Sequence, residues 1–149
     1  MQKMYQKHVF DLKTLKKMKD FSAVLVKTVR KYPVSVFFFL VIWYLSFFTP
    51  PKTELDEVAF IDKWVHVAMY GGTCATLWIE YLLRHKWVCD KTKLILWAWA
   101  MPILMSGCIE LLQQYCTGGR RSGDWIDLAA NATGVTLAAL FGLVLRKFH

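Results

Sequence analysis

The chain has 149 residues, of which 56% are apolar and 20% are charged, and its formal net charge at pH 7 is +8. A soluble domain of this size has a large surface for its volume and needs polar residues to cover it, so the composition argues against a soluble globular protein. The aromatic content of 15% excludes a disordered chain, and four cysteines without a CxxC motif argue against a disulfide scaffold. A small protein that crosses a membrane several times is the remaining class.

The N-terminal 31 residues are basic and hold nine Lys and Arg side chains. Apolar residues recur there every three or four positions, at Leu12, Leu15, Met18, Phe21 or Ser22, and Leu25. This spacing predicts a basic amphipathic helix that lies on the anionic cytoplasmic leaflet. The alternative is a loosely ordered tail that only sets the orientation of the chain in the membrane.

Four apolar runs follow the basic segment, at residues 34–48, 64–83, 94–112 and 125–145. Each run is close to the roughly 20 residues that a helix needs to cross about 30 Å of hydrocarbon. The runs are too long and too continuous for the alternating strands of a membrane barrel, so helices are expected. The sequence therefore predicts an all-α fold: a four-helix transmembrane bundle over residues 32–149, preceded by a cytoplasmic segment of residues 1–31.

Small residues and a proline predict how these helices pack. A stripe of small side chains repeats every four residues along the fourth run, at Ala130, Gly134, Ala138 and Gly142. Such a stripe lets a second backbone approach closely, either at Gly71 and Gly72 in the second run and Gly107 in the third, or from another copy of the chain in a homodimer. Pro102 is expected to kink the third run near its middle.

The orientation follows from the positions of the basic residues. Fifteen Lys and Arg side chains lie on the side that holds both termini and the second loop, and four lie on the other side. Basic residues concentrate in cytoplasmic loops, so both termini are predicted to be cytoplasmic. This bias also accounts for the net charge, and no nucleic-acid-binding motif is visible.

The polar residues of the helices are predicted to gather at their extracytoplasmic ends. Asp62, His66 and Tyr70 follow one another at intervals of four and share one helical face. Acidic and amide residues also end the third run and begin the fourth. The candidate ligand-binding residues are Asp62, Lys63, His66, Tyr70, Glu110, Gln113, Arg121, Asp124, Asp127 and Asn131.

Two interpretations of this cluster stay open. In the first it is a self-satisfied polar lock that fixes three helix ends together, with the guanidinium of Arg121 holding two carboxylate oxygens. In the second it is a pocket for a lipid head group or another envelope molecule, since clustered ionisable groups in membrane segments are usually functional. Lys63 and Arg121 would then meet a phosphate or carboxylate of the ligand.

Individual residues allow further roles. His66 and Glu110 are the candidates for proton transfer. For Glu110 the reason is that a carboxyl group in an apolar setting has a raised pKa. Asp124 also fits the N-cap of the fourth helix. His66, Glu110 and Asp127 could in principle bind a metal, but no known ligand spacing supports this, so neither a metal nor a cofactor is expected.

The order of these residues resembles the VanZ-like family of small bacterial membrane proteins. The resemblance covers residues 61–142 and rests on three linked motifs: Asp62-Lys63-x-x-His66-x-x-x-Tyr70, Glu110-x-x-Gln113 and Arg121-x-x-Asp124-x-x-Asp127-x-x-x-Asn131-x-x-Gly134. It implies four or five membrane helices, a location in the bacterial cytoplasmic membrane and a role in the cell envelope. The founding member is linked to low-level resistance to the lipoglycopeptide teicoplanin. The basic N-terminal segment lies outside the resemblance.

Three functional hypotheses follow. The favoured one is an envelope protein whose outer pocket binds a membrane lipid, a lipid-linked cell-wall precursor or a glycopeptide-like ligand. The alternative is a hydrolase or transferase that acts on a lipid-linked substrate, although no nucleophile in a GxSxG context is present. The third is half of a transporter, for which four helices are few and no inverted repeat is visible.

Overall fold

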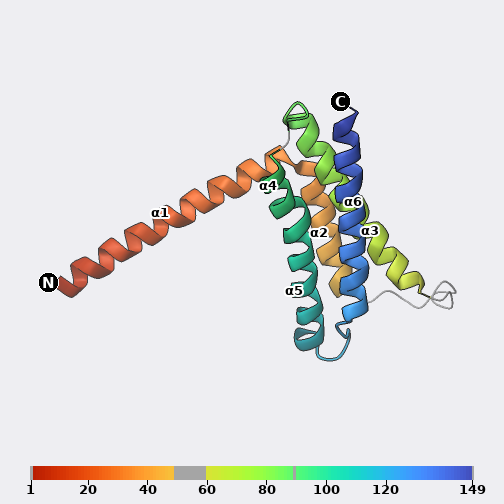
Figure 1. Cartoon of the computed structure of the whole chain (residues 1–149). Coiled ribbons are helices and arrows are strands. Elements are labelled where there is room, and N and C mark those ends of the chain that lie inside the picture. Colours follow the sequence, from red (N-terminus) through yellow and green to blue (C-terminus); the bar gives the residue numbers. More distant parts are fainter. Residues whose placement is uncertain (1, 49–59, 89, 149) are drawn as a thin grey trace. The chain divides into compact units, whose positions relative to one another are not determined.

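The computed structural model describes residues 2–48, 60–88 and 90–148, and all its regular elements there are helical (Figure 1). The chain forms two compact units, Met1–Pro33 and Val34–His149. The all-α class predicted from the sequence is confirmed.

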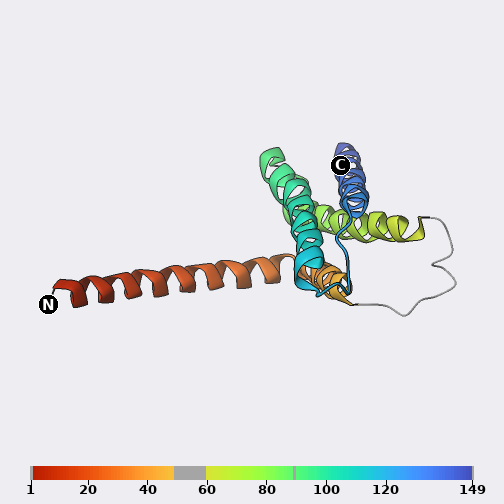
Figure 2. The same ribbon diagram turned by 90° about the horizontal axis from the view of Figure 1, so that it is seen from below.

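The first unit is a single helix, α1 (Gln2–Lys31), which Figure 2 shows as one long rod. Its side chains from Thr14 to Arg30 are all exposed. The helix ends just before Pro33, because the residue that precedes a proline is disfavoured in the helical region.

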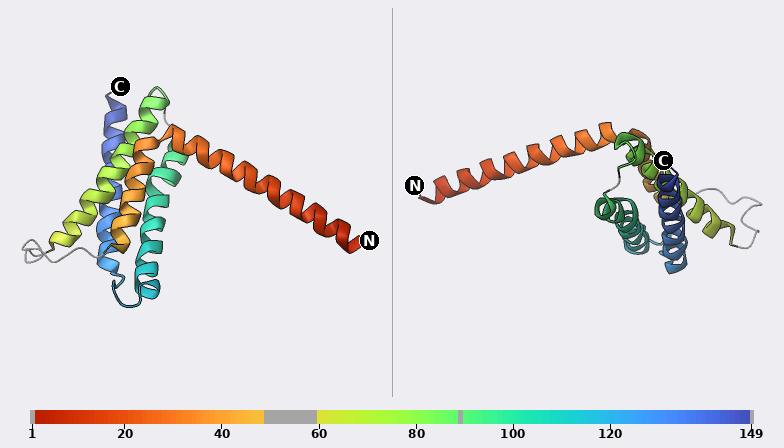
Figure 3. Two further views of the ribbon diagram at one scale, coloured as in Figure 1. Left: turned by 180° about the vertical axis from the view of Figure 1, so that it is seen from behind. Right: turned by 45° about the horizontal axis from the view of Figure 1, so that its top comes forward.

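The second unit contains a helix for each of the four apolar runs. These are α2 (Pro33–Phe47), α3 (Ile61–Arg84), a continuous rod made of α4 (Lys91–Ile95), η2 (Leu96–Ala100) and α5 (Met101–Cys116), and α6 (Trp125–Lys147). Thr92–Cys116 and Trp125–Lys147 are long and apolar enough to cross a membrane, whereas α2 has only 15 residues. Helices α2 and α5 end at the same end of this unit at which α3 and α6 begin (Figures 1 and 3).

The core of the second unit draws on α2, α3, α5 and α6. Ile42, Tyr70, Ile109 and Val135, one from each of these helices, are nearly inaccessible to solvent and form one cluster with Cys74 and Ala138. A second cluster, Trp78, Leu82, Leu94 and Ala98, joins α3 to the α4 end of the rod. The two clusters hold the helices together at different points along their length.

The closest helix pair is α3 with α6, and the small-residue stripe makes it possible. A methyl group on Gly134 would lie 2.4 Å from the carbonyl oxygen of Val67. A methyl group on Gly142 would lie 2.2 Å from the indole ring of Trp78. Of the three glycines predicted to meet this stripe, Gly71 does so at Gly134, whereas a Cβ on Gly72 has nothing within 4 Å and one on Gly107 lies near Leu128. The stripe is therefore occupied by α3 at Gly134 and Gly142.

Pro102 is accommodated by a short π-helical stretch, η2, directly before it. The N–H of Met101 donates to the carbonyl of Leu96, five residues earlier. A proline has no N–H to donate, and widening the preceding turn is a common way to absorb it. The side chains of Ala98 and Pro102 stay buried on the same side of the rod.

We predict that Gly142→Ala lowers the free energy of unfolding by about 1–3 kcal/mol, because the added methyl group overpacks against Trp78. Gly72→Ala is the matched control: it lies in α3 with open space around its Cβ, and it is expected to be neutral or slightly stabilising. Thermal unfolding of both purified variants in detergent, followed by circular dichroism, measures the difference. Equal stabilities would contradict the packing described here.

Candidate functional site

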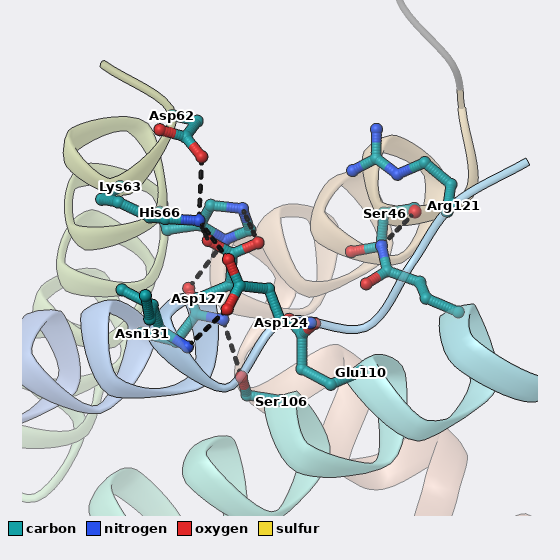
Figure 4. A network of polar contacts seen from close by, with 12 residues as sticks. Ser46, Asp62, Lys63, His66, Ser106, Glu110, Arg121, Asp124, Asp127 and Asn131 are labelled. Carbon is teal, nitrogen blue, oxygen red and sulfur yellow. Dashed lines mark hydrogen bonds and ion pairs between the residues drawn. The ribbon is translucent and has the colours of Figure 1, made fainter. Parts of the chain in front are cut away.

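A polar network joins α3, α5 and α6 at the end where α3 and α6 begin (Figure 4). Lys63, in the first turn of α3, is its centre. The ammonium nitrogen of Lys63 lies 2.9 Å from Asp62 Oδ2 and 2.7 Å from Asp124 Oδ2, and it also pairs with Asp127. The side chains of Lys63 and Asp127 are only 18% and 17% exposed. One cation thus ties the first turn of α3 to the start of α6.

The acidic residues suit their positions at helix N-termini, where the helix dipole favours negative charge. Asp124 is the N-cap of α6 and accepts a hydrogen bond from the N–H of Ile126 at 2.8 Å, as the sequence predicted. The hydrogen bond from the ammonium group of Lys63 lowers the pKa of the Asp124 carboxyl group. This carboxylate is therefore held in the charged form.

A chain of hydrogen bonds continues the network into the bundle, one turn from Lys63. His66 Nδ1 lies 3.0 Å from Asn131 Oδ1, and Asn131 Nδ2 donates to Ser106 Oγ at 2.7 Å. Because the amide nitrogen of Asn131 is used for Ser106, its oxygen accepts from His66. His66 Nε2 faces Asp127 Oδ2 at 3.6 Å. Both ring nitrogens of His66 thus face side chains of α6, and Nδ1 is hydrogen-bonded there.

Glu110 connects α5 to the loop that precedes α6. Glu110 is 4% exposed, and its Oε2 accepts the backbone N–H of Asp124 at 2.9 Å. Gln114, four residues further along α5, accepts the backbone N–H of Gly123 at 3.1 Å. A side chain at Gly123 would collide with the carbonyl oxygen of Glu110 at 2.4 Å. This contact requires glycine at residue 123 and fixes the start of α6 against α5.

Arg121 and Gln113 lie apart from the carboxylates. Arg121 Nη1 donates to the carbonyl of Phe48 at 3.3 Å, and Gln113 Nε2 donates to the carbonyl of Ser46 at 2.6 Å. Both residues therefore tie the loop and α5 to the end of α2. Within the described residues Arg121 does not form the expected ion pair with two carboxylate oxygens, and Lys63 pairs with the carboxylates instead. Tyr70 is buried in the apolar core.

A cavity of about 340 Å³ opens beside Glu110. Its polar lining comes from Glu110, Gln114 and Asp124, and its aromatic lining from Tyr115 and Trp125. The lining carries two carboxyl groups and no basic side chain. The cavity is therefore suited to hydrogen-bond donors or to a cation, which carboxylates and aromatic rings both attract.

The described parts of the chain offer no metal centre: no group of three His, Cys, Asp or Glu side chains in them is placed to hold an ion. The network has acidic members around His66, but Lys63 neutralises the nearest of them. Hydrogen bonds and ion pairs join the described side chains of the network.

Sequence reasoning missed several polar partners that lie inside apolar runs. Ser106 lies four residues before Glu110 on the same face of α5, a spacing that could have drawn attention to it. At the opposite end of the unit, the carboxylate of Glu80 accepts from the backbone N–H groups of Val34 and Ser35 and, at 2.5 Å, from the Ser35 hydroxyl. Glu80 thus caps the N-terminus of α2.

Comparison of the chain with known protein families, with curated proteins and with solved structures finds no match. The site is therefore described by its own geometry.

We predict that Lys63→Met lowers the free energy of unfolding by about 1–3 kcal/mol. This value lies between the cost of breaking an exposed ion pair and the cost of breaking a buried one. The reason is that three carboxylates lose the cation they share. The matched control is Lys93→Met, since Lys93 is 69% exposed and, among the described residues, forms its ion pair with Asp90; its loss is expected to cost less than about 1 kcal/mol. Chemical or thermal unfolding in detergent compares the two. A control as damaging as Lys63→Met would refute the central role of Lys63.

Proposed function

We propose that the chain is an integral membrane protein in which α2, α3, the α4–α5 rod and α6 cross the bilayer. In the two helices that are long and apolar enough to span it, only 33% and 28% of the most apolar window is buried within the protein. Large apolar side chains such as Trp97, Leu104 and Leu137 are exposed instead. Contiguous apolar surface of this extent is typical of a lipid-facing protein.

The polar network and its cavity are then at the extracytoplasmic face of the bacterial cytoplasmic membrane, with both termini in the cytoplasm. The excess of basic residues at the termini and in the α3–α4 loop supports this orientation. The direction of the helices supports it as well, because the start of α3 and of α6 lies at the end opposite the C-terminus (Figure 1).

We propose that the cavity binds the head group of a membrane lipid or of a lipid-linked cell-wall precursor. The observation that carries this proposal is the cavity beside Glu110, which has acidic and aromatic walls. The charge of Lys63 is already matched by three carboxylates, so the site favours a head group with an ammonium group or several hydroxyl groups over a purely anionic one.

Membership of the VanZ-like family, and with it a link to teicoplanin resistance, is part of the same proposal. It is supported by the way in which the motif residues assemble. Asp62 and Lys63, Glu110, and Asp124, Asp127 and Asn131 lie far apart in the sequence, yet they belong to one network.

An enzyme is less well supported. A hydrolase or transferase would need a nucleophile or an activated water beside His66 or Glu110. Within the described residues no hydrogen bond joins the Ser122 hydroxyl to either side chain, and the nitrogens of His66 face Asn131 and Asp127. Binding is therefore the function that the geometry supports best.

The orientation can be tested by thiol labelling in intact cells. In a chain with its native cysteines replaced, Ser122→Cys is expected to react with a membrane-impermeant maleimide, because it lies in the loop before α6. The matched control is Lys86→Cys in the α3–α4 loop, which should react only after the cells are opened. Labelling of residue 86 but not of residue 122 in intact cells would overturn the extracytoplasmic site.

Ligand binding can be tested with protein in nanodiscs. The probes are phosphatidylethanolamine, phosphatidylglycerol and a lipid-linked cell-wall precursor that carries a free amine, measured by native mass spectrometry. We predict preference for the amine-bearing probes and an increase in Kd of about tenfold or more in Glu110→Gln, the equivalent of one lost charged hydrogen bond. Asp90→Asn, an exposed residue outside the cavity, is the control. Preference for phosphatidylglycerol, or no change in Glu110→Gln with the fold intact, would contradict the proposal.

A further inference from the structure

The helix α1 has one continuous apolar face along the part whose side chains are described. Going along the chain from residue 15, the apolar residues come at intervals of three or four: Leu15, Met18, Phe21, Leu25 and Val29. In a helix with 3.6 residues per turn these side chains lie in one row. Each is exposed, from 41% for Val29 to 70% for Phe21.

The opposite face of α1 is strongly basic. Between residues 14 and 31 the helix carries six Lys or Arg side chains and a single acidic one, Asp20. At 100° per residue, Lys16, Lys19, Lys27 and Arg30 all fall in the half of the helix that is turned away from Phe21. The helix thus has a separated apolar and cationic side.

This amphipathic face needs an apolar partner that is also negatively charged. A helix with six basic residues and one acidic residue in 18 positions is too costly to place across the hydrocarbon core. A membrane surface that contains anionic lipids supplies both requirements: apolar chains for the row that includes Phe21, and phosphate groups for the lysines, whose stems reach out of the apolar layer.

A second copy of α1 is a poorer partner. Leu15, Met18, Leu25 and Val29 fit the spacing of a coiled coil, but Ser22 occupies the central core position. The row covers about two heptads, whereas a stable pairing usually needs three or four. Two such helices would also bring together several lysines of like charge.

We propose that α1 is a docking element for anionic lipids, lying in the plane of the membrane surface with Phe21 and Leu25 embedded and its lysines at the phosphate level. This inference rests on the membrane location proposed above, but it does not depend on the head-group site. If the head-group site is disproved, the proposed role of α1 is therefore unaffected, and the reverse also holds.

The test uses the full-length chain with its native cysteines replaced, reconstituted in liposomes. Spin labels are placed at Leu25→Cys on the apolar face and at Lys27→Cys on the opposite face. The exposure of each label is measured to oxygen, which concentrates in lipid, and to a nickel complex, which stays in water. In liposomes with phosphatidylglycerol, the label at residue 25 should be accessible to oxygen and the label at residue 27 to nickel. In pure phosphatidylcholine, or at high salt, the contrast should decrease, because the charge attraction is absent or screened.

Charge variants supply the matched controls. Each of Lys16→Gln and Lys19→Gln should lower the ratio of bound to free α1 about fivefold, whereas Asp20→Asn should raise it. Equal nickel accessibility of residues 25 and 27 in phosphatidylglycerol liposomes would overturn the proposal. So would spin–spin broadening between labels at residue 25 of neighbouring chains, which would identify a second copy as the partner. Neither result depends on the Glu110 cavity, so failure here is distinguishable from failure of the head-group proposal.

Discussion

The structure depends above all on one cation, Lys63, shared among three carboxylates from α3 and α6. Half-buried carboxylates repel one another and are expensive to keep charged without a counter-charge. Lys63 fixes the beginnings of α3 and α6 together, and this aligns the next turns of the two helices. His66 then contacts Asn131, and the backbones approach closely at Val67 and Gly134. The cavity beside Glu110 owes its shape to the same register.

Polar ties hold both ends of the second unit. In the membrane location proposed above, burial of apolar surface would give little drive for helices to associate, so hydrogen bonds and close packing would carry more of the stability. At one end, Gln113 and Arg121 bind carbonyl groups of α2. At the other, Glu80 binds the start of α2 through Ser35. The short helix α2 is thus anchored at both of its ends, although its contacts along the middle are mainly apolar.

The helices of this fold could be predicted from the sequence because each apolar run and each cap is a local pattern, as for Asp124 at the start of α6. Lys63, His66, Asp127 and Asn131 were also among the residues that the sequence predicted for the cluster. Which cation meets the carboxylates could not be predicted, because Lys63 and Arg121 differ only in where the folded chain brings them. Serines 35, 46 and 106 were missed because a serine within an apolar run gives no sign of its partner.

The π-helical stretch Leu96–Ala100 also makes the rod tolerant of one change in its length. Leu94 and Ser106 are both buried and face the same interior, although they are 12 residues apart. Three α-helical turns take about 11 residues, so this segment contains about one residue more than three turns need. The wide turn absorbs that surplus. Deleting one residue from this stretch would remove the surplus residue while Leu94 and Glu110 keep their present facing, with Pro102 still unable to donate a backbone hydrogen bond. The same deletion after Pro102 would rotate Glu110 by about 100° relative to Leu94, out of the interior. Natural insertions and deletions in this rod are therefore expected to concentrate within these five residues.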